Sequence, residues 1–182
     1  MLSDQILQKR TILDKTLVFR YPKQADVGDL LNLINSLVKE KTDIAKTTKT
    51  TLAKEKAWLN QTLESIKKKE KIMIVAELDG VCVGSCEITK DQYDVSRHVG
   101  TLGIGIIKQA RGIGIGTSLI QLCLKEAKKK IGIKLVKLYV FDTNKVGKSL
   151  YEEIGFREIG RIPKGVLHNG KYKDDIIMAK RL

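Results

Sequence analysis

The most chemically suggestive segment of the chain is a glycine-rich turn that leads into an apolar segment with helical spacing. Residues 109–117 read QARGIGIGT, and we expect a helix over residues 115–130. Such a turn presents unpaired backbone N–H groups and the positive end of a helix dipole, which together attract phosphate oxygens. Arg111 can add a charged donor. The turn therefore predicts an anion site, with a tight structural turn that binds no ligand as the alternative.

Two widespread phosphate-binding patterns do not fit this turn. A Walker A loop needs a Lys directly after its glycines, and none follows here. The dinucleotide-binding pattern GxGxxG fails because Leu119 stands where the last glycine is required. The expected hairpin before the turn also does not suit the start of a dinucleotide-binding unit.

The strand that precedes the turn has an unusual pattern. Within residues 98–107, Gly103 and Gly105 alternate with apolar residues, so one face covers the core and the other is almost free of side chains. Glycine inside a strand weakens it and usually marks a bulge or a place where another group approaches the backbone closely. We therefore expect this strand to border the anion site.

The periodicity of the apolar residues predicts the elements that position these two segments. Helical spacing marks residues 26–38, 52–66, 115–130 and 144–154, and β-type runs mark residues 17–21, 72–78, 81–89, 98–107, 134–141, 156–162 and 172–179. Asp79-Gly80 is a favoured two-residue hairpin turn, and Gly155 predicts a left-handed helix cap. Residues 41–51, rich in Lys and Thr, predict a mobile loop. The order predicts a mixed α/β sheet, antiparallel early and with βαβ crossovers later.

Composition narrows the class of protein. The chain has 182 residues, with 34 Lys and Arg against 21 Asp and Glu, which gives a formal net charge of +13. This length suits one domain that folds without a disulfide or a structural metal. The positive charge attracts anions and disfavours polycationic substrates. The composition disfavours nucleic acid as the partner, because Lys far outnumbers Arg and aromatic residues are few.

The cysteines and apolar runs indicate a cytoplasmic protein. No apolar run is long enough to cross a membrane, and the first ten residues lack the order of a secretory signal. The three cysteines include no CxxC pair, which indicates a reducing compartment. We expect Cys123 in the core, Cys82 and Cys86 on one face of a strand, and no metal site.

Three blocks of the sequence, in order, resemble a known family. Arg111-x-x-Gly114-x-Gly116 resembles the acetyl-CoA signature of the GNAT superfamily of N-acetyltransferases, and residues 144–156 (NKVGKSLYEEIGF) resemble its second block. Residues 169–178 (NGKYKDDIIM) look like the closing strand of a branch that acts on small molecules or amino acids. The resemblance covers roughly residues 17–182. It implies an α/β (α+β) fold with a mixed, largely antiparallel twisted sheet of six to seven strands and helices on both faces. It also implies a single N-acetyltransferase domain over residues 1–182, of which residues 1–16 are an N-terminal extension.

The resemblance implies direct attack of a primary amine on acetyl-CoA, the co-substrate, in a ternary complex. Tyr151 stands at the position of the general acid that protonates the departing thiolate, and an aromatic that only packs is the alternative. The main chain near Ile106 would stabilise the oxyanion. Asn144 would bind the pantetheine arm, cap its helix, or do both. The implied coenzyme contacts are Ile106, Arg111, Gly112, Ile113, Gly114, Gly116, Thr117, Asn144 and Tyr151.

The general base is the role that the sequence defines least. Related proteins often carry an acidic residue where this chain has Thr101, and Thr cannot accept a proton at useful pH. Glu87 on the preceding strand is the candidate base, with a water chain as the alternative and a merely solvated Glu87 as the simplest reading. His98 has a suitable pKa but lies at the far end of its strand from the turn, so we expect a surface or packing role.

The acceptor is open among several classes. The closing block favours a small amine or amino acid, and a protein N-terminus, including a ribosomal one, is the alternative. A non-catalytic CoA-binding regulatory module is a further alternative, motivated by Thr101. The resemblance implies that residues 41–51 cover the acceptor. We expect no membrane partner. A homodimer is possible, and the sequence does not decide the oligomeric state.

Overall fold

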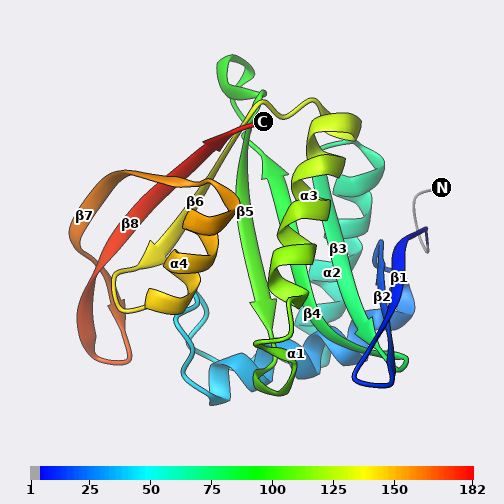
Figure 1. Ribbon diagram of the computed structural model, residues 1–182. Helices are drawn as coiled ribbons and strands as arrows, with labels where there is room; N and C mark the ends of the chain where they lie inside the picture. Colours follow the sequence, from blue (N-terminus) through cyan, green and yellow to red (C-terminus); the bar gives the residue numbers. More distant parts are fainter. Residues whose placement is uncertain (1–4) are drawn as a thin grey trace.

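The β-type runs of the sequence form one eight-stranded sheet in the computed structural model, which describes residues 5–182 (Figure 1). The strand order is β1-β2-β3-β4-β5-β6-β8-β7. Only β5 and β6 are parallel among these neighbours, so the sheet is largely antiparallel, as expected. The bounds are β1 Ile6–Ile12, β2 Lys15–Arg20, β3 Lys71–Leu78, β4 Val81–Lys90, β5 Val99–Ile106, β6 Leu135–Phe141, β7 Arg157–His168 and β8 Lys171–Arg181.

Helices cover both faces of this sheet. They are α1 Val27–Lys39, α2 Leu52–Lys67, α3 Ile115–Ile131 and α4 Lys145–Ile154, with short 3-10 turns at Gln24–Asp26, Asp94–Ser96 and Lys108–Ala110. Leu33 and Leu37 of α1 lie over Gly105 of β5, while Gly116 of α3 lies against Ile106, whose side chain points to the other face. Hence α1 and α3 lie on opposite sides of β5, with α2 beside α1 and α4 beside α3 (Figure 1).

Local signals in the sequence fix several element ends. Asp79 and Gly80 adopt the positive φ values, 49° and 83°, that the β3–β4 hairpin turn requires. Gly155 has a φ of 98° and ends α4 in the left-handed conformation, as predicted. Thr51 caps α2 by accepting a hydrogen bond from the backbone N–H of Lys54.

The N-terminal segment differs from the expectation. Part of the predicted extension is a strand, because Ile6–Ile12 pairs antiparallel with β2 and raises the strand count to eight. The turn between these strands consists of Leu13 and Asp14, both with positive φ and neither a glycine, so it lacks the usual sequence signal. Residues 1–4 lie outside the described part of the chain.

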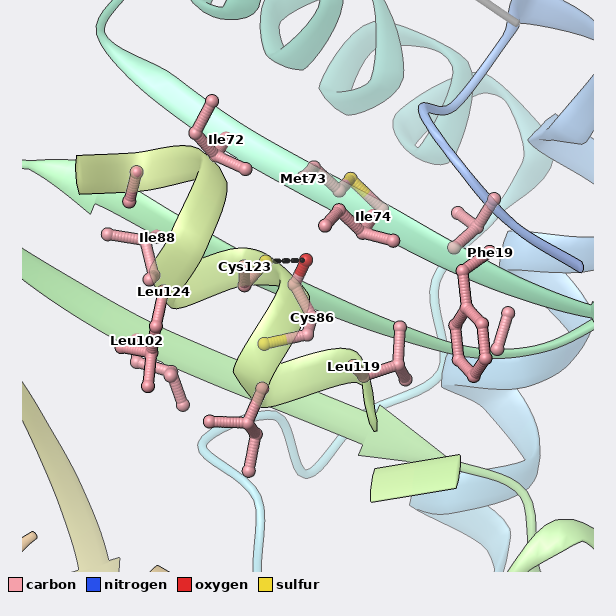
Figure 2. Close-up of a cluster of buried hydrophobic side chains, with 14 of the residues drawn as sticks. Phe19, Ile72, Met73, Ile74, Cys86, Ile88, Leu102, Leu119, Cys123 and Leu124 are labelled. Atoms are coloured by element: carbon pink, nitrogen blue, oxygen red, sulfur yellow. Dashed lines mark hydrogen bonds between the residues drawn. The ribbon is translucent and has the colours of Figure 1, made fainter. Parts of the chain in front are cut away.

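The core lies between the sheet and the helices, and Figure 2 shows the part beneath α3. There the Sγ of Cys123 donates to the carbonyl of Cys86 at 3.1 Å, which confirms Cys123 as a core residue. The expectation that Cys82 and Cys86 share a face is wrong. A bulge in β4 pairs Gly84 with Ala76 but Cys82 with Glu77, which turns Cys82 toward α1, where its N–H donates to Asp29 at 2.9 Å.

Three further observations complete the fold. His98 is exposed at the start of β5, which confirms its expected surface position. Within residues 5–182, no helix has both the length and the apolar character that crossing a bilayer requires. The same residues hold no cluster of three or more side chains suited to bind a metal ion.

Candidate active site

The site begins where β5 and β6 part. Their register pairs run only from Val99–Leu135 to Thr101–Lys137, although β5 continues to Ile106 and β6 to Phe141. The unpaired edge of β5 therefore borders a gap in the middle of the sheet. A cavity of about 1940 Å³ occupies this region and reaches from the glycine turn to α2 and to the β7–β8 hairpin. Its volume exceeds the roughly 300–1,000 Å³ typical of a site for one drug-sized ligand.

The glycine turn lies at one end of the cavity with its amides free. Gly112 and Gly114 have φ values of 77° and 80°, a backbone conformation that other residues rarely adopt. The amides of Ala110 and Arg111 donate to the carbonyls of Ile107 and Lys108 at the 3-10 turn after β5, but none of residues 112–117 donates a backbone bond to any described residue. These unpaired N–H groups begin α3, so they suit a phosphate group.

Most of the residues predicted to bind coenzyme or to catalyse come together in this cavity. The Ile113 side chain is the exception, because it packs against the hydrophobic core. The predicted residues that line the cavity are Glu87, Ile106, Arg111, Gly112, Gly114, Gly116, Thr117, Asn144 and Tyr151.

The Arg111 side chain differs from the expected phosphate donor. Its Nη1 and Nη2 donate to the two carboxylate oxygens of Glu40 at 2.6 and 2.8 Å, and its Nε donates to the carbonyl of Ile106 at 2.9 Å. The bond from Arg111 lowers the pKa of the Glu40 carboxyl, so the pair is ionised at neutral pH. Arg111 therefore fixes the turn to α1 and to the end of β5.

A second arginine reaches the same turn from the N-terminal hairpin. Arg10 of β1 stacks over the Phe19 ring at 5.6 Å, and its Nη2 lies 3.9 Å from where a methyl group on Gly114 would stand. Its Nε is buried and has no hydrogen-bond partner among the described residues. Arg10 is thus a cation at the start of α3 whose charge no carboxylate of the described chain balances.

Tyr151 lies deep in the cavity wall. Only 8% of its surface is exposed, and its ring meets Phe156 edge-on with centroids 6.1 Å apart. The Tyr151 hydroxyl makes no hydrogen bond to any described residue. Burial raises the pKa of this phenol far above its ordinary value, so it keeps its proton at any working pH. The geometry leaves a protonated hydroxyl available to a ligand in the cavity.

Asn144 caps α4 with one side of its amide. Its Oδ1 accepts from the N–H of Gly147 at 2.9 Å, which confirms the capping role. A Cβ on Gly147 would lie 2.8–2.9 Å from three atoms of the Asn144 side chain, so a larger residue here would displace that side chain. The Nδ2 group stays unused by the cap, and Asn144 lines the cavity.

The candidate base Glu87 is already paired. It stands over Gly103, its register partner in β5, and its Oε2 accepts from Lys71 Nζ at 2.9 Å. The Lys71 ammonium also lies 5.9 Å from the centre of the Trp58 ring. Thr101 does not line this cavity; it borders a shallow depression near Lys137.

The loop between α1 and α2 forms another wall. Asp43 accepts from Thr143 at 2.7 Å and from Lys173 at 2.5 Å, which ties the loop to the β6–α4 connection and to β8. Residues 42–47 line the cavity together with the buried His168. Sequence reasoning missed Asp43, Lys173 and His168, because their contact joins segments more than a hundred residues apart.

Two further carboxyl groups of the cavity wall, both wholly or partly shielded from solvent, have no cationic partner within hydrogen-bonding distance. Glu55 on α2 is only 8% exposed, and its side chain makes no hydrogen bond or ion pair with a described residue. Asp175 on β8 has an Oδ1 that is fully buried and unpartnered. Burial raises the pKa of both carboxyl groups, and Lys46 offsets this in part for Glu55. Sequence reasoning missed both residues.

Comparisons with known proteins agree with this geometry. An N-alpha-acetyltransferase of Sulfurisphaera tokodaii is 30% identical over 105 residues, which cover 53% of this chain and 63% of that protein, less than two thirds of its length. A GNAT-family acetyltransferase from Streptococcus pneumoniae superposes with a TM-score of 0.81 at 26% identity, over 91% of this chain and 99% of that one. A ribosomal-protein-alanine N-acetyltransferase from Brucella melitensis gives 0.81 at 25% identity, over 90% and 99%. Residues 34–156 match the sequence model of the acetyltransferase (GNAT) family, and the chain therefore belongs to that family.

Proposed function

We propose that the chain transfers an acetyl group from acetyl-CoA to a primary amine by direct attack. The observation that supports this most is the set of free amides over residues 112–117, at the end of a cavity that also reaches Tyr151. Phosphates at the turn would place the pantetheine arm along the unpaired edge of β5, near the Nδ2 of Asn144. The volume of the cavity leaves room for an acceptor beside the coenzyme.

The residues have complementary roles in this reaction. The main chain at the end of β5 donates to the thioester oxygen as negative charge develops on it. The amine nitrogen forms a bond to the acetyl carbon, and the carbon–sulfur bond breaks. The Tyr151 hydroxyl gives its proton to the departing thiolate, and its high pKa keeps it protonated until that moment.

We propose an α-amine as the acceptor, because the available indications share that group. The N-alpha-acetyltransferase and the ribosomal-protein-alanine N-acetyltransferase support a protein N-terminus. The closing block over residues 169–178 supports an amino acid or another small amine. The cavity is bounded by the α1–α2 loop and the β7–β8 hairpin, which are separate segments able to contact a substrate from two sides.

The experiment is a titration with acetyl-CoA followed by a screen of amines. Calorimetry should give saturable binding of acetyl-CoA, and a thiol-release assay should give turnover with peptides that carry a free N-terminus or with free amino acids. Absence of acetyl-CoA binding would contradict the proposal as a whole. Turnover with amino acids and none with peptides would exclude the protein N-terminus only.

A non-catalytic CoA-binding module is the competing function. Its motivation is the missing acid at Thr101, yet Thr101 does not line the cavity and so offers no side chain to a ligand there. Binding of acetyl-CoA without turnover for any amine class would favour this module.

A further inference from the structure

We propose that Glu55, and not Glu87, binds the acceptor ammonium and takes up the proton that it must lose. This inference rests on the proposed function, because it assigns a residue to the acceptor end of the same cavity. The acceptor amine arrives mostly protonated, since the pKa of an aliphatic amine lies well above neutral pH. An attacking nitrogen needs its lone pair, so the site must hold a group that accepts a proton.

Glu55 is buried and its carboxylate has no hydrogen-bond donor, as this role requires. It lies one turn before Trp58 on α2, and both residues line the cavity. Although 92% of Glu55 is shielded from solvent, no described residue donates a hydrogen bond to its carboxylate. Its oxygens are not among the fully buried polar atoms, and Glu55 is one of the residues that line the cavity. A buried carboxylate without a partner is costly, and an ammonium ligand would remove that cost.

The other acidic groups of the cavity are less suited. Glu87 accepts a charged hydrogen bond from Lys71 at 2.9 Å, and Asp43 is held by Lys173 and Thr143. Asp175 has one oxygen sealed from the open space of the cavity. Glu153 also lines the cavity without a partner, but it is exposed to solvent. Glu55 is therefore the buried carboxylate of the cavity with its accepting capacity free.

The burial of Glu55 raises its pKa toward the range that suits a base. Lys46 of the α1–α2 loop acts on it electrostatically, and Lys54 lines the same wall. Burial outweighs the effect of Lys46, so the pKa of Glu55 stands above its ordinary value. A base works best when its pKa approaches the working pH.

The protons balance with these two residues. The acceptor ammonium gives one proton to the Glu55 carboxylate, and the freed lone pair forms the bond to the acetyl carbon. A second proton leaves the nitrogen as the amide forms. The Tyr151 hydroxyl protonates the sulfur and takes up this second proton in turn, while Glu55 releases the first proton to solvent. One proton therefore ends on the CoA thiol and one in solvent.

The test compares Glu55→Gln with two control variants in the full chain. Glu64→Gln changes an exposed residue of the same helix that is paired with Lys67, and Glu87→Gln removes the rival base. We expect Glu55→Gln to lower kcat/KM for the amine by about 100-fold or more and to flatten the acidic limb of its pH profile. The Kd for acetyl-CoA should stay within about twofold, and Glu64→Gln should behave as wild type. Glu55→Asp, which keeps the carboxylate, should recover part of the rate.

The outcomes separate the two proposals. A Glu55→Gln variant that keeps at least a third of the wild-type kcat/KM would overturn the inference. Loss of the acidic limb in Glu87→Gln alone would also overturn it and would assign the base to β4. If the wild type binds acetyl-CoA and acetylates an amine, either result leaves the proposed function intact.

Discussion

Replacing Tyr151 with Phe separates catalysis from packing. The change removes one oxygen from a side chain that is 8% exposed and leaves the ring in its edge-on contact with Phe156. The hydroxyl makes no hydrogen bond within residues 5–182, so its removal leaves no buried group without a hydrogen-bond partner. We therefore expect the free energy of unfolding to change by less than about 1 kcal/mol, since the usual cost of a lost hydrogen bond does not apply.

The rate should respond very differently. A positioned general acid contributes a factor of roughly 10²–10⁴, so kcat of Tyr151→Phe should fall by at least about 100-fold. Steady-state thiol release measures kcat, and chemical denaturation measures stability. Acetyl-CoA titration serves as the control, and its Kd should change little because the ring still lines the cavity.

One result would refute this reasoning directly. If Tyr151→Phe retains the wild-type kcat while chemistry limits the rate, the hydroxyl does not protonate the thiolate. The residue would then be a packing aromatic, which was the alternative at the level of the sequence.

Four further changes test other parts of the site. Arg10→Gln should weaken CoA binding about tenfold in calorimetry by removing a cation beside the phosphate turn, whereas the binding of pantetheine, which lacks phosphate, should not change. Burial raises the pKa of Glu55 in the folded state, so its stability penalty grows as pH rises above the ordinary Glu pKa of 4.5 and levels off above the raised pKa. Glu55→Gln should therefore unfold at a higher denaturant concentration than wild type at pH 7, and the difference should vanish at pH values below 4.5. Asp43→Asn should raise the acceptor KM several-fold in kinetic assays by releasing the α1–α2 loop, without changing the Kd for acetyl-CoA. Gly147→Ala should displace the Asn144 cap and lower the melting temperature, consistent with a loss of about 1 kcal/mol.

Much of the fold follows from local signals in the sequence. The alternation of apolar residues locates the central strands, and the left-handed glycine at 155 and the Asp79-Gly80 turn mark ends where only certain residues fit. The glycine turn was predictable for the same reason, because φ values near 80° at Gly112 and Gly114 need glycine. These features depend on a few neighbouring residues, which a single sequence displays.

The features that the sequence does not reveal depend on distant contacts or on backbone irregularity. Strand β1 is an edge strand with few apolar residues, and hydrogen bonds to β2 hold it. The bulge that turns Cys82 toward α1 leaves no trace in the composition of β4. The pairing of Arg111 with Glu40 spans 71 residues, so its charge looked free for a phosphate. Glu55, in turn, resembles an ordinary acidic residue in the first turn of a helix.

The short pairing between β5 and β6 has a thermodynamic consequence. Register pairs from Val99 to Thr101 of β5 hold strands β1–β5 to strands β6–β8, and beyond Thr101 no backbone pairing between β5 and β6 joins the two blocks. A co-substrate that contacts both blocks should stabilise their arrangement. Its binding should therefore slow hydrogen exchange of the backbone amides on both sides of the gap. Saturation at a hundred times Kd would add about 2.7 kcal/mol to the stability of the fold. The melting temperature of the protein should therefore rise with the concentration of acetyl-CoA.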